Sequence, residues 1–226
     1  MIAAPSYDHI DRILNEEELT SGRRFSLGIP KETGTVGFIL FDQNFSRYPI
    51  TDLVANLDML HIYSGTDIHF FLCGVSQFGP SESGARELGE LNGVTLYHNA
   101  EAAYSFVKAF EREIPGWNYD LGFELVLVDV VENNHIRTLD FNSSVFFKVE
   151  ELIKVGIIER PSELFNKLVK FARDGNLSNA AAFRDELERV FGINWLKGLI
   201  LAMFPKSVGR LARTKAVLGG SASLPE

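Results

Sequence analysis

The chain has 226 residues, of which 46% are hydrophobic and 23% are charged, and its formal net charge is −8 at pH 7. These values exclude a disordered or fibrous chain and favour one large domain with a single core over two independent domains. The acidic balance also argues against nucleic-acid binding over the whole surface, because phosphates are held by Lys and Arg.

Cysteine content indicates a reducing compartment. Cys73 is the only cysteine, so an intramolecular disulfide is excluded and a thiolate-based zinc site is not expected. The N-terminal residues show no basic region followed by an apolar stretch, and no apolar run has the length of a membrane span. We therefore expect a cytoplasmic protein.

The first third of the chain predicts two buried strands joined by a helix. Residues 8–20 predict a short acidic helix, and residues 23–29 are compatible with an edge strand. The segment 36–42 (VGFILFD) is apolar on both faces, which is typical of a central strand covered on two sides. Apolar residues at helical spacing predict a helix over 49–64, and a second buried strand is expected over 67–75.

The middle of the chain predicts a loop, a helix and a hairpin. The stretch 76–98 is rich in Gly and Ser and is expected to be the most loop-like insertion, ending in a short strand. Asn99 is expected to cap a helix that runs to about residue 114. The segment 123–131 predicts a third strong strand, and a shorter strand, IRTLDF, is expected to pair back on it after a four-residue turn.

From Ser144 onward the pattern predicts helices alone. The segment 145–155 is ambiguous, because its first residues (VFFKV) could also extend as a strand. Residues 161–173 predict a helix, and two more are expected over 178–191 and from about residue 194.

This order, β-α-β-α-β-β-α, resembles the thioredoxin-like core, in which a mixed central sheet is covered by helices on both faces. The resemblance is one of element order and includes no sequence motif, and a doubly wound sheet with another strand order fits nearly as well. We expect an α/β domain over residues 1–175, a helical extension over 176–218 that packs on it or projects from it, and a disordered tail over 219–226.

The resemblance implies a place for a redox motif, at the start of the predicted helix 49–64. The sequence there reads NFSRYP (44–49) and holds no thiol pair. Dithiol exchange proceeds by thiolate attack through a mixed disulfide, so it is excluded at this place. Cys73 lies among apolar residues of a strand, an environment that raises a thiol pKa, and we expect it to be a core residue.

Polar residues follow the first two predicted strands and form the candidate ligand-binding residues. Asp42 and Asn44 follow the first strand, and Ser76 and Gln77 follow the second. Ligands of open α/β sheets bind outside the carboxyl ends of the strands, so these four residues are expected to share one rim. The alternative is structural, with Asp42 and Asn44 capping the turn into the helix.

Other motifs give little support to catalysis. Residues 79–84 have the spacing of two P-loop glycines but are not followed by the Lys and Ser or Thr that bind phosphate and magnesium. His61, Asp67 and His69 could hold a divalent ion, although a core histidine is the commoner role. No nucleophile elbow or metalloprotease motif is present in the sequence. We predict no cofactor and no metal, and the sequence favours a protein that is not an enzyme.

The C-terminal segment differs in charge from the rest of the chain. Residues 194–226 hold five basic residues against Glu226 alone, a net of +4, which leaves −12 for residues 1–193. The segment is amphipathic if helical. Its candidate interaction residues are three apolar and three basic side chains: Trp195, Leu199, Met203, Lys206, Arg210 and Arg213.

Three uses of this segment are compatible with its pattern. It could pack on its own acidic domain, dock with a protein partner or a second copy of the chain, or attach to an anionic membrane or nucleic acid. The leading hypothesis is a non-catalytic, non-redox interaction module that acts through this segment, with no disulfide-linked partner. The alternative is a small-molecule or nucleotide-binding enzyme or sensor that uses the strand-end rim.

Overall fold

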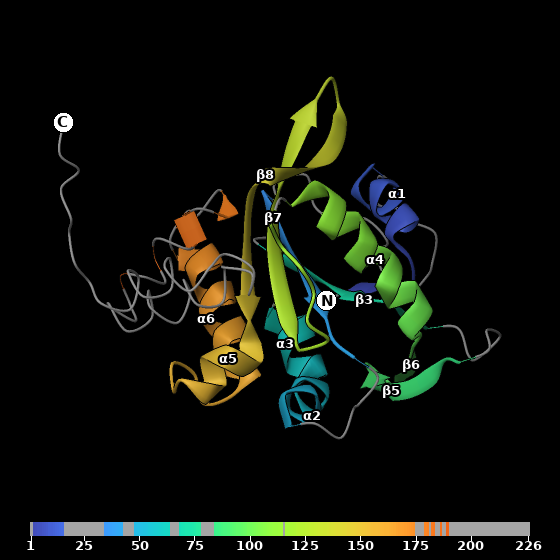
Figure 1. Ribbon diagram of the computed structural model, residues 1–226, viewed down its shortest axis with the longest axis vertical. Helices are drawn as coiled ribbons and strands as arrows, with labels where there is room; N and C mark the ends of the chain where they lie inside the picture. The colour runs from blue at the N-terminus through green and yellow to red at the C-terminus, as the bar shows by residue number, and fades with distance from the viewer. Residues whose placement is uncertain are drawn as a thin grey trace.

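The computed structural model describes most of the chain up to residue 189. The described residues are 2–15, 34–42, 48–63, 68–77, 84–114, 116–174, 179, 180, 182, 183, 186 and 189. Within them the chain forms a mixed α/β fold, with a five-stranded mixed sheet between two layers of helices and a second, three-stranded sheet (Figure 1). The predicted strand 23–29, Asn44, Asp67, the six C-terminal interaction residues and the tail 219–226 all lie outside the described residues.

The main sheet has the strand order β1-β3-β2-β7-β8. Its strands are β1 (Ile2–Ala4), β2 (Thr35–Leu40), β3 (His69–Cys73), β7 (Glu124–Asn133) and β8 (Ile136–Lys148). The first three strands are parallel to one another, whereas β7 runs antiparallel to β2 and β8 antiparallel to β7. The three predicted buried strands are therefore confirmed as neighbours in the interior of the sheet, and β1 is an edge strand that the sequence did not indicate.

Helices cover both faces of this sheet because its strands are apolar on both faces. Every residue of β2 is buried, with Phe38 packed in the core on one face and Ile39 in the core on the other. The face of Phe38 is covered by a 3-10 turn and two helices: η1 (Tyr7–His9), α1 (Ile10–Asn15) and α4 (Ala100–Glu113). The face of Ile39 is covered by four helices: α2 (Tyr48–Ala55), α3 (Leu57–Tyr63), α5 (Val149–Lys154) and α6 (Pro161–Asp174). Figure 1 shows α1 and α4 on one side of the sheet and α5 and α6 on the other.

The predicted helix 49–64 is two helices, because Asn56 interrupts it. The Asn56 side chain donates to the main-chain oxygen of Asp52 at 2.7 Å. Asn competes in this way with the backbone hydrogen bonds of a helix, and α2 ends at Ala55. The expected helix at 161–173 is confirmed as α6.

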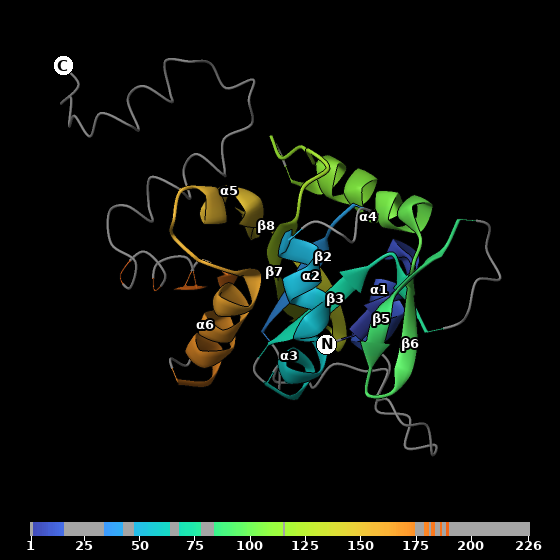
Figure 2. The same cartoon turned by 90° about the horizontal axis from the view of Figure 1, so that it is seen from below.

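In the stretch 76–98, the described residues 76, 77 and 84–98 belong to a second sheet and its connections, and the short strand expected at the end of the stretch is confirmed over Val94–His98. The strand order of this sheet is β4-β6-β5, with β4 (Val75–Ser76), β5 (Arg86–Leu91) and β6 (Val94–His98) all antiparallel. Figure 2 shows β5 and β6 as a hairpin at the side of the main sheet. Gly74, at φ +73°, connects β3 to β4, and a Cβ there would lie 2.6 Å from the main-chain nitrogen of Ala103. The chain therefore changes sheets at a residue where only glycine fits.

The hairpin of β7 and β8 is longer and tighter than expected. Its turn has two residues, Asn134 and His135, both at positive φ, in place of the predicted four. The prediction of helices alone from Ser144 is wrong for residues 144–148, because β8 runs to Lys148. The alternative of a strand at the start of the segment 145–155 is the one that forms. The last residues of β8 alternate between the two cores: Val145 and Phe147 pack on the face of α6 and Phe146 on the face of α4.

Two side chains anchor helix starts, one as expected and one not. Asn99 caps α4 as predicted, since its side chain accepts from the main-chain N–H groups of Glu101 and Ala102. The buried Asp129 carboxylate accepts from the Ala180 N–H at 2.6 Å, and Ala180 and Phe183 are buried in the core on the α6 face. The chain beyond α6 is thus held against the main sheet at this point. Among the helices described, none combines the length and apolarity needed to cross a membrane.

Candidate functional site

Charged side chains meet where β7 begins and β8 ends. Glu124, the first residue of β7, pairs with Leu40 at the end of β2 on one side and with Lys148 on the other. This edge is therefore the carboxyl end of the parallel strands β2 and β3, where ligands bind in open α/β sheets. We call Trp117, Tyr119, Asp120, Glu124 and Lys148 the strand-end cluster.

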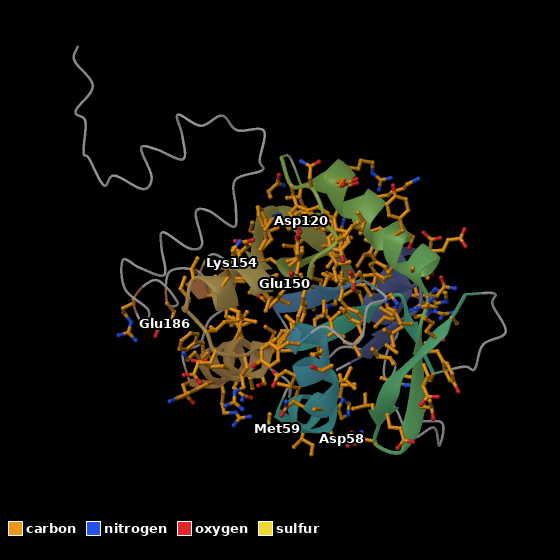
Figure 3. The ribbon with its side chains drawn as sticks, turned by 60° about the horizontal axis from the view of Figure 1, so that its bottom comes forward. Asp58, Met59, Asp120, Glu150, Lys154 and Glu186 are labelled. Atoms are coloured by element: carbon orange, nitrogen blue, oxygen red, sulfur yellow. The ribbon has the colours of Figure 1, made fainter. Side chains whose placement is uncertain are left out.

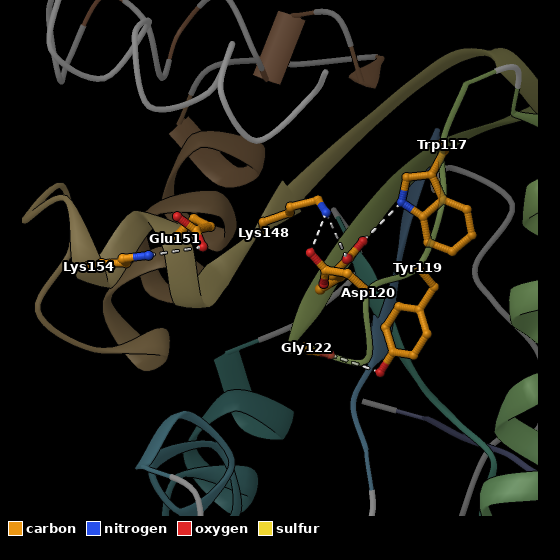
Figure 4. Close-up of polar contacts among 8 residues, drawn as sticks. Trp117, Tyr119, Asp120, Gly122, Lys148, Glu151 and Lys154 are labelled. Atoms are coloured by element: carbon orange, nitrogen blue, oxygen red, sulfur yellow. Dashed lines mark hydrogen bonds and ion pairs between the residues drawn. The ribbon is translucent and has the colours of Figure 1, made fainter. Parts of the chain in front are cut away.

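The strand-end cluster is joined by short polar contacts (Figure 4). The Lys148 ammonium lies 2.6 Å from Asp120 Oδ2 and 3.7 Å from Glu124 Oε1. The Trp117 indole N–H donates to Glu124 Oε2 at 3.0 Å. The Tyr119 hydroxyl donates to the main-chain oxygen of Gly122 at 2.8 Å, which holds the loop before β7 in a closed turn.

Burial keeps Glu124 protonated at neutral pH. The residue is fully buried, and loss of solvation raises its pKa to about 8. The Lys148 ammonium opposes this rise, and the Asp120 carboxylate adds to it. A protonated Glu124 has an O–H group that can donate to Asp120, so the two carboxyl groups share one negative charge opposite Lys148.

The loop from α4 to β7 fixes the position of Asp120. The Trp117 ring is buried and meets the Phe110 ring of α4 edge to face, with 5.9 Å between ring centroids. Leu121 has a positive φ of 63° and is 65% exposed, which is uncommon for a leucine. The loop is therefore anchored in the core by Trp117 and strained at its exposed tip.

A pocket of about 120 Å³, which we call the strand-end pocket, opens beside this loop. It is lined by Asp120, Leu121, Gly122, Phe123, Lys148, Glu150 and Glu151. Three carboxylates and one ammonium line it, and the exposed Lys154 lies 3.6 Å from Glu151. In Figure 3 Asp120, Glu150 and Lys154 lie on the same side of the molecule. The walls of the pocket carry more negative than positive charge.

The rim residues expected from the sequence take several positions. Asp42 follows β2 as expected and lies near buried His98. Burial lowers the pKa of His98 to about 4, although the Asp42 charge opposes this shift. Ser76 is part of β4, paired with Tyr97, and Gln77 follows it directly. His98 itself stacks on Phe41 with ring centroids 4.7 Å apart.

Sequence reasoning missed the strand-end cluster, although one signal was present. Glu124 is the only charged residue in the apolar run FELVLV, and Lys148 follows the apolar run VFF. Opposite charges directly across two paired strands attract each other, so a hairpin with this register would have brought them together. The second strand predicted from the sequence, IRTLDF, ends before Lys148. The pairing of Lys148 with Glu124 could therefore not be predicted.

The buried thiol and the histidines take no part in this site. Burial raises the pKa of the Cys73 thiol well above its usual range, in agreement with a core role. Burial lowers the pKa of His69 to about 4. Among the residues that the structure describes, no group of three or more His, Cys, Asp or Glu side chains could hold a metal ion.

Chemically, the strand-end cluster offers a buried acid, an adjacent carboxylate and an ammonium beside a small acidic pocket. Such a set can bind a cation and can take up or release a proton near neutral pH. Comparison of the chain with protein-family models, curated proteins and solved structures gave no match.

Proposed function

We propose that the chain is a binding domain of thioredoxin-like architecture, without dithiol redox activity, that holds a positively charged group of a protein partner in the strand-end pocket. The order β3-β2-β7-β8, with β7 antiparallel to β2, supports this architecture. So do the helices between consecutive strands, since α2 and α3 lie on one face and α4 on the other.

The charge of the pocket lining is the observation that carries the proposal. Asp120, Glu150 and Glu151 line the pocket with Lys148, and Lys148 lies between two carboxyl groups. An ammonium or guanidinium group entering the pocket gains charge-assisted hydrogen bonds, whereas a phosphate or carboxylate is repelled. The ligand group is therefore expected to be a cation.

The size of the pocket favours a side chain over a whole small molecule. Sites for small molecules and cofactors span roughly 300–1,000 Å³, whereas this pocket holds about 120 Å³. That volume suits the end of one lysine or arginine side chain. A polypeptide that presents such a residue is the partner that fits, and a nucleotide is not.

The test measures binding of cationic and anionic probes to the full chain by calorimetry. Arginine amide and an Arg-containing peptide are expected to bind, and acetate and phosphate are not. Glu150→Gln should weaken cation binding by about fivefold. Glu87→Gln is the matched control, because Glu87 is exposed on β5 in the second sheet. Failure of both cationic probes to bind, or equal binding of acetate, would refute the proposal.

A second candidate function rests on the charge contrast of the sequence. The +4 segment 194–226 follows a body of −12, which favours a docking segment for a protein partner or second copy, or for an anionic membrane or nucleic acid. The triple variant Lys206→Glu, Arg210→Glu, Arg213→Glu tests it in the full chain. Loss of self-association, or of salt-sensitive binding to anionic vesicles or DNA, supports this role. An unchanged result in all three assays removes it.

A further inference from the structure

Glu124 links the wall of the pocket to the interior of the protein. Its carboxyl group accepts from the buried Trp117 indole on one side and lies beside Asp120 and Lys148 on the other. Asp120 and Lys148 line the pocket, whereas Trp117 is packed in the core with α4. A change at the Glu124 carboxyl group therefore affects both the pocket wall, through Asp120 and Lys148, and the core, through Trp117.

The protonation state of Glu124 decides whether the charges of Asp120, Glu124 and Lys148 neutralise one another. With Glu124 protonated, the Asp120 carboxylate and the Lys148 ammonium neutralise each other and the acid O–H can donate to Asp120. With Glu124 ionised, two carboxylates face each other over one ammonium, and a buried charge is left with poor solvation. Movement of the strained loop tip at Leu121 would separate Asp120 from Glu124. This separation reduces the repulsion between the two carboxylates and improves the solvation of the Glu124 charge.

We propose that Glu124 is a proton-operated latch on the strand-end pocket: when protonated it holds Asp120 and the loop 117–122 closed, and when ionised it releases them and makes the pocket a stronger cation site. The part of this inference that concerns ligand affinity rests on the function proposed above. The movement of the loop does not.

The groups that face Glu124 set the pH at which the latch opens. Lys148 on β8 favours the ionised acid, and Asp120 in the loop opposes it. The phenol of Tyr119 stays protonated in the range of interest, because burial raises its pKa. Asp42, beyond the end of β2, and Glu150 on α5 add negative charge nearby, and α4 contributes the Phe110 ring. The opening is therefore expected near pH 8.

The first experiment reads the latch without any ligand. Trp195→Phe leaves Trp117 as the only tryptophan of the full chain, and its emission is recorded from pH 5.5 to 9.5. A one-proton transition near pH 8 is expected, absent from Glu124→Gln in the same background and retained in Glu87→Gln. Asp120→Asn should shift the midpoint down and Lys148→Met should shift it up. A flat profile, or a transition that persists in Glu124→Gln, overturns the latch.

If Glu124→Gln does not fold, the opposite shifts of the Asp120→Asn and Lys148→Met midpoints decide alone. Shifts in the expected directions support the latch, and equal midpoints overturn it.

The second experiment measures the affinity for arginine amide as a function of pH. If only the ionised state binds, roughly 1% of the protein is competent two pH units below the midpoint, so affinity at pH 6 is about 100-fold below its plateau. Proton release on binding should accompany this change. Cation binding with the same affinity from pH 6 to 8 overturns the latch. A Trp117 transition without cation binding supports the latch and refutes the proposed function.

Discussion

Replacing Glu124 by Gln tests the energetic meaning of the buried acid. In the native state Glu124 keeps its proton until about pH 8, whereas in the unfolded chain the carboxyl group ionises near its ordinary pKa of 4.5. Between these values the native state binds more protons than the unfolded state, so the free energy of unfolding falls as pH rises. Gln has nearly the same shape, accepts from Trp117 through its oxygen and does not titrate.

The magnitude follows from the difference of about 3.5 pH units between the two states, at about 1.4 kcal/mol per unit. The acid therefore lowers stability by on the order of 4 to 5 kcal/mol once the pH exceeds about 8, and by almost nothing below about pH 4.5. No discount for solvent screening applies, because Glu124 is fully buried. Wild type and Glu124→Gln should have similar stability at low pH, and the variant should become the more stable as pH rises.

The assay is urea unfolding of both proteins at several pH values between about 5 and 9, followed by far-UV circular dichroism. The difference in the free energy of unfolding should grow by about 1.4 kcal/mol per pH unit between roughly pH 5.5 and 7.5 and level off above about pH 8. Titration of other carboxylates cancels in this difference. Parallel stability curves, or a wild type that gains on the variant with rising pH, would contradict a protonated buried acid.

Three further results are expected. The Cys73 thiol should react with an aromatic disulfide reagent only after unfolding, because it is buried and its pKa is raised; fast reaction in native protein would be inconsistent with this. Asn99→Ala should lower the free energy of unfolding by about 1 kcal/mol, as loss of a helix cap does, and an unchanged urea midpoint would count against the cap. Asp129→Ala should lower it by about 3 kcal/mol and speed proteolysis near Ala180, since the Asp129 carboxylate accepts from Thr35, Ser143 and Ala180; equal cleavage rates would show that it is no anchor.

The interior strands could be predicted from sequence because their burial is uniform. Segments such as VGFILF remain apolar over both faces, a pattern that only a covered strand or a buried helix explains, and their short length favours the strand. The second sheet could not be predicted in the same way. In β5 (RELGEL) only Leu88 and Leu91 are buried. The other four residues are three charged residues and a glycine, so the segment resembles a loop.

The candidate site was harder to predict than the fold, because it depends on register. Asp42 was identifiable as a polar residue at a strand end, and the structure places it at that edge. Glu124 and Lys148 lie 24 positions apart in the sequence, and nothing local shows that they are opposite each other. The two residues meet only if β8 continues past Ser144. The sequence VFFKV is compatible with either a strand or a helix, so it does not decide this point. A one-residue slip would place Lys148 on the other face of the sheet.

Two buried acids in one strand show why the strand-end cluster is the better candidate for function. Asp129 accepts from the Thr35 hydroxyl, the Ser143 hydroxyl and the Ala180 N–H, so three donors satisfy its carboxylate oxygens. Among the residues that the structure describes, Glu124 has one such donor, Trp117, together with an ammonium at 3.7 Å and a competing carboxylate. A buried ionisable group whose desolvation is only partly offset by its partners lowers the stability of the fold. Apolar residues of similar volume in its place would avoid this desolvation penalty. Because its partners also line a pocket, this strain lies where binding can relieve it, whereas Asp129 already has the contacts that a structural anchor needs.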